Sequence, residues 1–111
     1  MRKDEFITFR RISLDEGNKD FFVNRKELIE RMEDLKYRYE GNNEFAKKFV
    51  KILPDTLIVT IDVDRNRNLD HPLVICATLD DRPAEVVKIP RRNEKIWEIL
   101  NEYISDEFIK D

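Results

Sequence analysis

Alternation of apolar and polar residues along the chain predicts four β-strands. In the clearest strand, at 57–63, every second residue is apolar, and these residues would share one face of a sheet: Leu57, Val59, Ile61 and Val63. The other strands are predicted at residues 5–12, 72–79 and 84–89. Residues 14–20 contain a Gly-Asn turn signal and are predicted to form a loop.

Apolar residues spaced three and four positions apart predict three helices. Asn24 is the expected N-cap of the first helix, because Glu27 follows three positions later and completes a capping box. A second helix is expected over residues 44–53, where a proline ends it. Asn93 is expected to cap a closing helix over residues 94–108.

The expected order of elements is therefore β-α-α-β-β-β-α within a single domain, residues 1–111. Short connections make the last three strands an antiparallel meander. We expect an α+β fold with a mainly antiparallel sheet, covered on one face by the three helices as a two-layer sandwich. The pattern does not determine the place of the first strand in the sheet.

Charged residues make up 41% of the chain, well above the roughly 25% of ordinary soluble domains, so we expect a densely charged surface. The 21 basic and 24 acidic residues nearly balance, and the net charge is −3. No overall field would attract nucleic acid or an anionic membrane, so such contacts need a local patch. The chain shows no signal-like or membrane-spanning apolar segment, and we expect a cytoplasmic protein.

One local patch of positive charge follows from the predicted meander. The connection after the strand at 57–63 and the end of the last strand should lie at the same end of the sheet. That end would gather several cationic side chains beside the start of the closing helix: Arg65, Arg67, Arg91, Arg92 and Asn93. Arginine side chains and the free N–H groups of a helix start suit phosphate, other anions or nucleic acid. The alternative is a set of solvated arginines, partly neutralised by neighbouring carboxylates.

Asp62 and Asp64 form a D-x-D pair at the end of the strand at 57–63. A hydrophobic strand that ends in D-x-D resembles the metal-binding strand of primase- and polymerase-type palm domains and of some nucleotide-sugar transferases. The resemblance is confined to this one strand. It implies a divalent-metal-dependent enzyme in which both carboxylates bind the metal, but no third carboxylate can be placed beside them.

The same stretch partly matches an EF-hand calcium loop, with oxygen-bearing side chains at alternate positions: Asp62, Asp64, Asn66, Asn68 and Asp70. Arg67 occupies the position that needs glycine, and Leu73 occupies the position that needs glutamate. A strand is also predicted where the first helix of an EF-hand should be. We interpret this match as coincidence.

Three single residues complete the candidates. Cys76 is the only cysteine, which excludes a disulfide framework, and we expect it to be a small buried hydrophobic residue. His71 is the only histidine, and we expect it to be exposed. On an extended strand it would lie about 16 Å from Cys76, which is too far for a Cys–His catalytic pair. Tyr37 lies opposite the apolar side of the first helix, and we expect it to be exposed as a contact for a partner. Single exposed aromatic residues are also ordinary.

These observations favour a small non-enzymatic interaction protein, an adaptor, regulator or inhibitor that binds a larger macromolecule. The expected partner is another protein, and no cofactor or membrane contact is expected. One alternative is binding of phosphate or nucleic acid through the arginine cluster. Another is a divalent-metal-dependent enzyme that uses Asp62 and Asp64. The oligomeric state is open, although an edge strand that pairs with itself would give a dimer.

Overall fold

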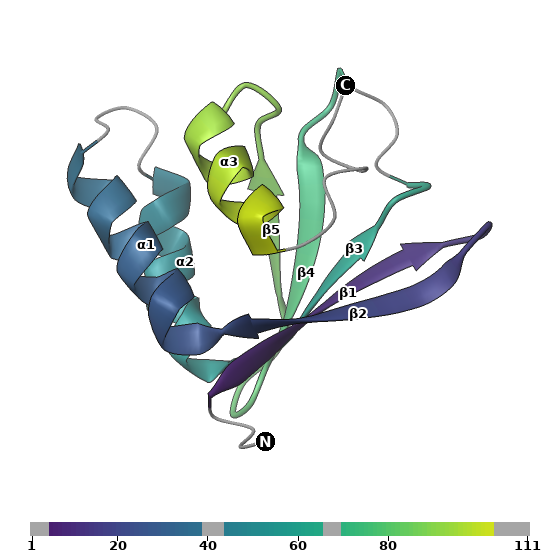
Figure 1. Ribbon diagram of the computed structural model, residues 1–111, viewed down its shortest axis with the longest axis horizontal. Coiled ribbons are helices and arrows are strands. Elements are labelled where there is room, and N and C mark those ends of the chain that lie inside the picture. The colour runs from purple at the N-terminus through teal and green to yellow at the C-terminus, as the bar shows by residue number, and fades with distance from the viewer. Residues whose placement is uncertain (1–4, 39–43, 66–69, 104–111) are drawn as a thin grey trace.

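The computed structural model describes residues 5–38, 44–65 and 70–103, and Figure 1 shows their arrangement. The strands are β1 (Phe6–Ser13), β2 (Gly17–Asn24), β3 (Thr56–Asp62), β4 (Leu73–Leu79) and β5 (Glu85–Ile89). The helices are α1 (Arg25–Arg38), α2 (Glu44–Ile52), the short 3₁₀ helix η1 (Leu53–Asp55) and α3 (Glu94–Tyr103). The strands form one mixed sheet in the order β2-β1-β3-β4-β5, and the fold is α+β.

The predicted order of elements is nearly right, but the prediction that residues 14–20 form a loop is wrong. These residues contain the turn of a β-hairpin and the first half of β2, which pairs with β1 along its whole length. β2 is an edge strand, and Asn18, Lys19 and Asp20 are all exposed on it. The first half of β2 contains no apolar residue, because both of its sides are exposed. Alternation of apolar and polar residues therefore could not identify it as a strand.

The prediction of a mainly antiparallel sheet is also wrong, because β1 and β3 are parallel. β2 returns the chain to the end of the sheet where β1 starts. The helices α1 and α2 then form a hairpin that brings the chain back to this same end (Figure 1). β3 therefore starts beside the start of β1 and runs in the same direction. The antiparallel meander of β3, β4 and β5 is confirmed.

The sheet has one covered face and one open face. Strand residues on the covered face share a single core with residues of α1, α2 and α3, which lie on this side of the sheet (Figure 1). On the opposite face, none of the strand residues that the structure describes is buried. We call this surface the open face, and its residues are Phe6, Thr8, Arg10, Ile12, Asn18, Asp20, Phe22, Asn24, Ile58, Thr60, Asp62, Val74, Cys76, Thr78, Val86 and Lys88.

An irregularity at the start of β3 changes the predicted inward set of that strand. The register with β4 shifts between Thr56 and Ile58. Thr56 is fully buried and its hydroxyl donates to the carbonyl of Ile52 at 2.8 Å, whereas Leu57 is 37% exposed. Val59 and Ile61 are buried as predicted. The placement of Leu57 with them is wrong, because a bulge changes the side on which the preceding residues lie.

The predicted helix starts agree with the structure. The Asn24 side-chain oxygen accepts the N–H of Glu27 at 2.9 Å, which confirms the N-cap of α1. α3 begins at Glu94, directly after Asn93, as expected. Residues 104–108 of the predicted closing helix lie outside the described residues. The starts therefore follow from local side-chain chemistry that the sequence makes visible.

Arg25 joins three segments at the end of the sheet where β1 and β3 begin. Its Nη1 donates to the carbonyls of Leu53 and Thr56, each at 2.6 Å, and its Nη2 donates to the carbonyl of Phe6 at 3.1 Å. Its backbone N–H donates to the carbonyl of Glu5 at 2.8 Å. One guanidinium group therefore satisfies carbonyls of β1, η1 and β3, a role that the sequence did not reveal.

Candidate functional site

The segments that carry Arg65, Arg91 and Arg92 lie at one end of the sheet. Thr60 of β3 pairs with Cys76 of β4, and Leu73 of β4 pairs with Ile89 of β5. The end of β3, the start of β4 and the end of β5 therefore meet at one end of the sheet. Arg65 follows β3, and Arg91 and Arg92 follow β5. Arg67 lies outside the described residues.

A pocket of about 380 Å³ lies at this end, between the start of β4 and the end of β5. The Nε of Arg91 donates to the carbonyl of His71 at 3.3 Å, so this arginine bridges the two strand ends. His71 is exposed, as predicted. Arg65 is not among the residues that line the pocket, which are Asp70, His71, Pro72, Pro90, Arg91 and Arg92.

Asn93, the fifth residue of the predicted cluster, is only 3% exposed. Its backbone N–H donates to the carbonyl of Pro90 at 3.0 Å, and its own carbonyl accepts the N–H of Trp97 at 3.3 Å. The indole N–H of Trp97 also donates to Pro90, at 3.0 Å. These contacts fix the turn from β5 into α3. The structure thus uses Asn93 to begin the helix.

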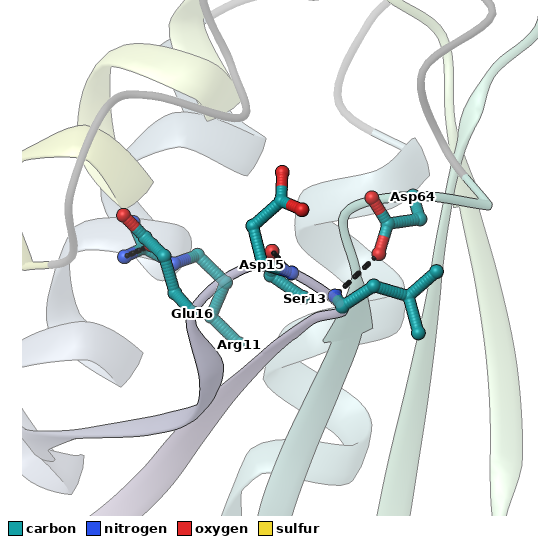
Figure 2. A network of polar contacts seen from close by, with 6 residues as sticks. Arg11, Ser13, Asp15, Glu16 and Asp64 are labelled. Carbon is teal, nitrogen blue, oxygen red and sulfur yellow. Dashed lines mark hydrogen bonds and ion pairs between the residues drawn. The ribbon is translucent and has the colours of Figure 1, made fainter.

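The D-x-D carboxylates hold backbone groups at the end of β3. An oxygen of Asp62 accepts the N–H of Arg65 at 3.0 Å, and an oxygen of Asp64 accepts the N–H of Leu14 at 2.7 Å (Figure 2). The second bond ties the β1–β2 turn to the end of β3. In the described part of the chain, no three His, Cys, Asp or Glu side chains are grouped so that they could hold a metal ion. Asn66 and Asn68 lie outside that part.

The turn between β1 and β2 contains a polar network that the sequence did not predict (Figure 2). Arg11 is only 4% exposed, and its Nη2 donates to a carboxylate oxygen of Glu16 at 3.0 Å. Its guanidinium also lies 5.6 Å from the ring centre of Phe21 on β2. Ser13 accepts the N–H of Asp15 at 3.3 Å through its hydroxyl. The contact between Arg11 and Phe21 depends on β2 lying beside β1.

The open face is continuous across the whole sheet. One cross-strand row runs from β2 to β5 through Asp20, Arg10, Thr60, Cys76 and Val86. Arg10 and Asp20 form a two-bond ion pair, with Nε–Oδ1 at 2.9 Å and Nη2–Oδ2 at 3.1 Å. The hydrogen bond from Arg10 lowers the pKa of Asp20, and the same bond raises the pKa of Arg10.

Cys76 is exposed on this face, so the prediction that it is buried is wrong. The neighbouring residues Ile75 and Ala77 point to the covered face and are fully buried. Side chains alternate between the two faces along a strand, and Cys76 must therefore point to the open face. The sequence could not distinguish the two faces of β4, because both carry small or apolar residues.

Tyr37 is 78% exposed on α1, in agreement with its predicted exposure. The Nζ of Lys36 lies 5.2 Å from the centre of its ring. α1 packs on the covered side of the sheet, so Tyr37 does not belong to the open face (Figure 1). Its role as a partner contact stays a prediction.

A second polar cluster joins α1 to α3. Arg31 forms two hydrogen bonds with Glu102, and the Tyr103 hydroxyl donates to Glu27 at 2.8 Å. The hydrogen bond raises the pKa of Arg31 and lowers that of Glu102. Burial, and then the bond to Glu27, raise the pKa of Tyr103. Every group in this cluster has a partner on the other helix, which indicates a structural role.

Comparison with known proteins does not place this chain in a group: no protein-family model matches it, and neither a curated protein nor a solved structure matches it. Among the helices that the structure describes, none has the length and apolar character needed to cross a membrane.

Proposed function

We propose that this protein is a non-enzymatic binding protein, a two-layer sandwich whose open face docks a larger partner protein. One observation carries the proposal: the open face has four charged residues among its sixteen, a smaller share than the 41% of the whole chain. Apart from the Arg10–Asp20 pair, its charged residues are Asp62 and Lys88. Depletion of charge is typical of the central part of protein–protein interfaces.

The remaining side chains of the open face suit desolvation by a partner. Ile58 and Thr60 lie at its centre on β3, with Cys76 beside them on β4. Phe22 and Val86 lie on the two edge strands and are 56% and 51% exposed. Covering apolar side chains with another surface removes apolar area from water, which is favourable. A role as adaptor, regulator or inhibitor is consistent with such a surface.

A substitution at the centre of the open face tests this proposal. Thr60→Lys places a charge where the partner would exclude water, and it should abolish capture of the partner in affinity purification from the native cell. Ala84→Lys is the matched control, because it adds the same charge in the exposed turn before β5. Proteins that bind the wild type and the control but not Thr60→Lys support the proposal. Equal capture by all three chains contradicts it.

Cys76 offers a second readout of the same surface. It is the only cysteine of the chain and is exposed on the open face. A maleimide reagent should label it readily in the isolated protein and slowly in the captured complex. Unchanged labelling in the complex would show that the partner binds elsewhere.

Anion binding is a second candidate function. Its site would be the pocket between the start of β4 and the end of β5, which Arg91 and Arg92 line. Binding of a single-stranded oligonucleotide should weaken with salt, and the slope of log affinity against log salt should be about −0.7 for each phosphate contacted. Arg92→Ala should reduce affinity and slope. Arg65→Ala is a useful comparison, because Arg65 does not line the pocket. No affinity at low salt would exclude this function.

The third candidate function is a divalent-metal-dependent enzyme in which Asp62 and Asp64 would bind the metal. Each of these carboxylates already accepts a backbone N–H. Calorimetric titration of the wild type with Mg²⁺, Mn²⁺ and Ca²⁺ tests it, and a binding signal that Asp64→Asn removes would support it. Absence of any signal would argue against it.

A further inference from the structure

The outer edge of β2 is a long, regular edge of the sheet. β2 is a terminal strand in the sheet order, and its eight residues pair with β1 without a register shift. Within the described part of the chain, no strand pairs with its other side. An unbroken edge of this kind presents backbone N–H and C=O groups that can pair with a further strand.

The hydrogen bonds of the hairpin show which backbone groups face this edge. The N–H of Arg25 donates to the carbonyl of Glu5 at 2.8 Å, so these two residues form a hydrogen-bonded pair. In an antiparallel ladder such pairs alternate with pairs whose backbone groups point away. The N–H and C=O groups of Asn18, Asp20 and Phe22 therefore point toward the outer edge of β2.

The opposite edge of the sheet is built differently. β5 has five residues, and Pro83 and Pro90 stand on either side of it. The Nζ of Lys48 on α2 donates to the carbonyl of Val86 at 3.3 Å. Short edge strands, prolines and lysines are the usual protection against pairing with another chain. β2 has eight residues and no proline, and its pairing with β1 has no bulge, so that Lys19 is the one such device it carries.

Two consecutive phenylalanines on β2 are incompletely covered. Phe21 is half-buried on the covered face, and Phe22 is 56% exposed on the open face. A strand added at this edge would bring side chains against both rings, one on each face. The edge therefore offers backbone pairing together with apolar surface.

We propose that β2 pairs antiparallel with β2 of a second copy of this chain, about a twofold axis at Phe21, so that the two sheets become continuous. In this register the backbone groups of Asp20 in one copy bond those of Phe22 in the other. The two Phe21 rings lie opposite each other on the covered face. The proposal goes beyond the proposed function, and it would join two open faces into one surface.

The side chains of β2 favour this register over its neighbours. Paired residues of an antiparallel ladder lie on the same face, so the axis must pass through a residue. An axis at Lys19 or Asp20 would place like charges directly opposite each other, which is unfavourable. An axis at Phe22 would shorten the ladder, because β2 ends two residues later at Asn24. An axis at Phe21 avoids both problems.

Sedimentation equilibrium of the full chain tests the proposal. At about 100 µM the wild type should have twice the 13.4 kDa mass of one chain. Phe21→Lys and Phe21→Glu each place two like charges at the axis, and each should raise the dimer dissociation constant at least about tenfold. An equimolar mixture of the two variants should recover the dimer, because opposite charges then face each other. Val86→Lys, on the other edge, is the control and should stay dimeric.

Amide hydrogen exchange gives a readout that needs no variant. The amides of Asp20 and Phe22 should be protected at about 100 µM and lose protection on dilution below the dissociation constant. The amides of Lys19 and Phe21 face β1 and should stay protected at both concentrations. This second measurement keeps the test decisive if Phe21 variants fold poorly.

A monomer at about 100 µM overturns the proposal and leaves the edge to a strand from elsewhere. A dimer that persists in both folded Phe21 variants, or one with unprotected Asp20 and Phe22 amides, also overturns it. Thr60→Lys should remain dimeric, because Thr60 lies on β3 and not at this edge. Failure of the dimer and failure of the proposed function are therefore distinguishable.

Discussion

The two faces of the sheet are made by the same strands and have opposite properties. Phe9 on β1 points to the covered face and is 1% exposed, whereas Phe22 on the adjacent β2 points to the open face and is 56% exposed. The helices α1, α2 and α3 pack against the first of these faces (Figure 1). The difference shows that apolar character alone does not decide burial. What decides it is the side of the sheet on which the connecting helices pack.

The largest expected effect comes from removing the same ring on each face. Phe9→Ala should lower the free energy of unfolding by about 3–5 kcal/mol, because it leaves a cavity in the core. Phe22→Ala should lower it by less than about 1 kcal/mol, because that ring is largely in water already. Urea unfolding of the two variants measures this comparison. Equal losses would contradict the assignment of the two faces.

The next effect concerns the corner of the sheet that Arg25 holds together. Arg25→Lys removes the planar group that donates to Phe6, Leu53 and Thr56, and a lysine cannot reach all three carbonyls. We expect a loss of about 2–3 kcal/mol in the free energy of unfolding. Lys26→Ala, at the exposed neighbouring position, is the control and should stay within about 0.5 kcal/mol of the wild type. An unchanged free energy of unfolding in Arg25→Lys would mean that these hydrogen bonds add little stability.

A smaller effect is expected at the turn that places β2 at the edge. Gly17 has a φ of +73°, in the left-handed region, and a Cβ added there would meet no atom of a more distant residue within 4 Å. Gly17→Ala should therefore cost about 1–2 kcal/mol through backbone strain, with no steric clash. Asn18→Ala is the matched control and should change stability little. Thermal unfolding followed by circular dichroism would separate the two variants.

The smallest expected effect comes from the ion pair on the open face. Arg10 lowers the pKa of Asp20 below its ordinary value of 3.8. A carboxyl whose pKa is lowered on folding stabilises the fold above its unfolded pKa and loses this contribution as pH falls through its folded pKa. Arg10→Gln should therefore be slightly less stable than the wild type at neutral pH. Urea unfolding at several pH values should show the difference shrink as the pH falls below 3.8 and through the lowered pKa of Asp20. A difference that persists there would have another cause.

Much of the fold could be predicted from local patterns. Helical spacing and the Asn24 cap marked α1, and alternation marked β3 and the meander that follows it. The same meander correctly brought the chain after β3 and the chain after β5 to one end of the sheet. These features depend on neighbours in sequence, or on strands joined by short connections.

The candidate sites were predicted less well from the sequence than the fold was. The pocket takes in Arg91 and Arg92 but not Arg65, and Asn93 is buried in the turn before α3. Asp64 was predicted as a possible metal ligand beside Asp62, which stays a prediction, and its contact with the N–H of Leu14 comes from a hairpin that the pattern had missed. A side chain's partners lie far along the chain, and residue spacing does not reveal them.

The sequence by itself determined the helices and four of the strands, because their periodicity and caps are local properties. Only the tertiary structure decided that β2 forms an edge, that β1 lies parallel to β3, and that Cys76 points to the open face. An edge strand needs no apolar alternation, and a strand with small or apolar residues on both sides is compatible with either orientation. The packing of the helices against one side of the sheet decided the orientation of Cys76, whereas the connections through β2 and the two helices made β1 and β3 parallel.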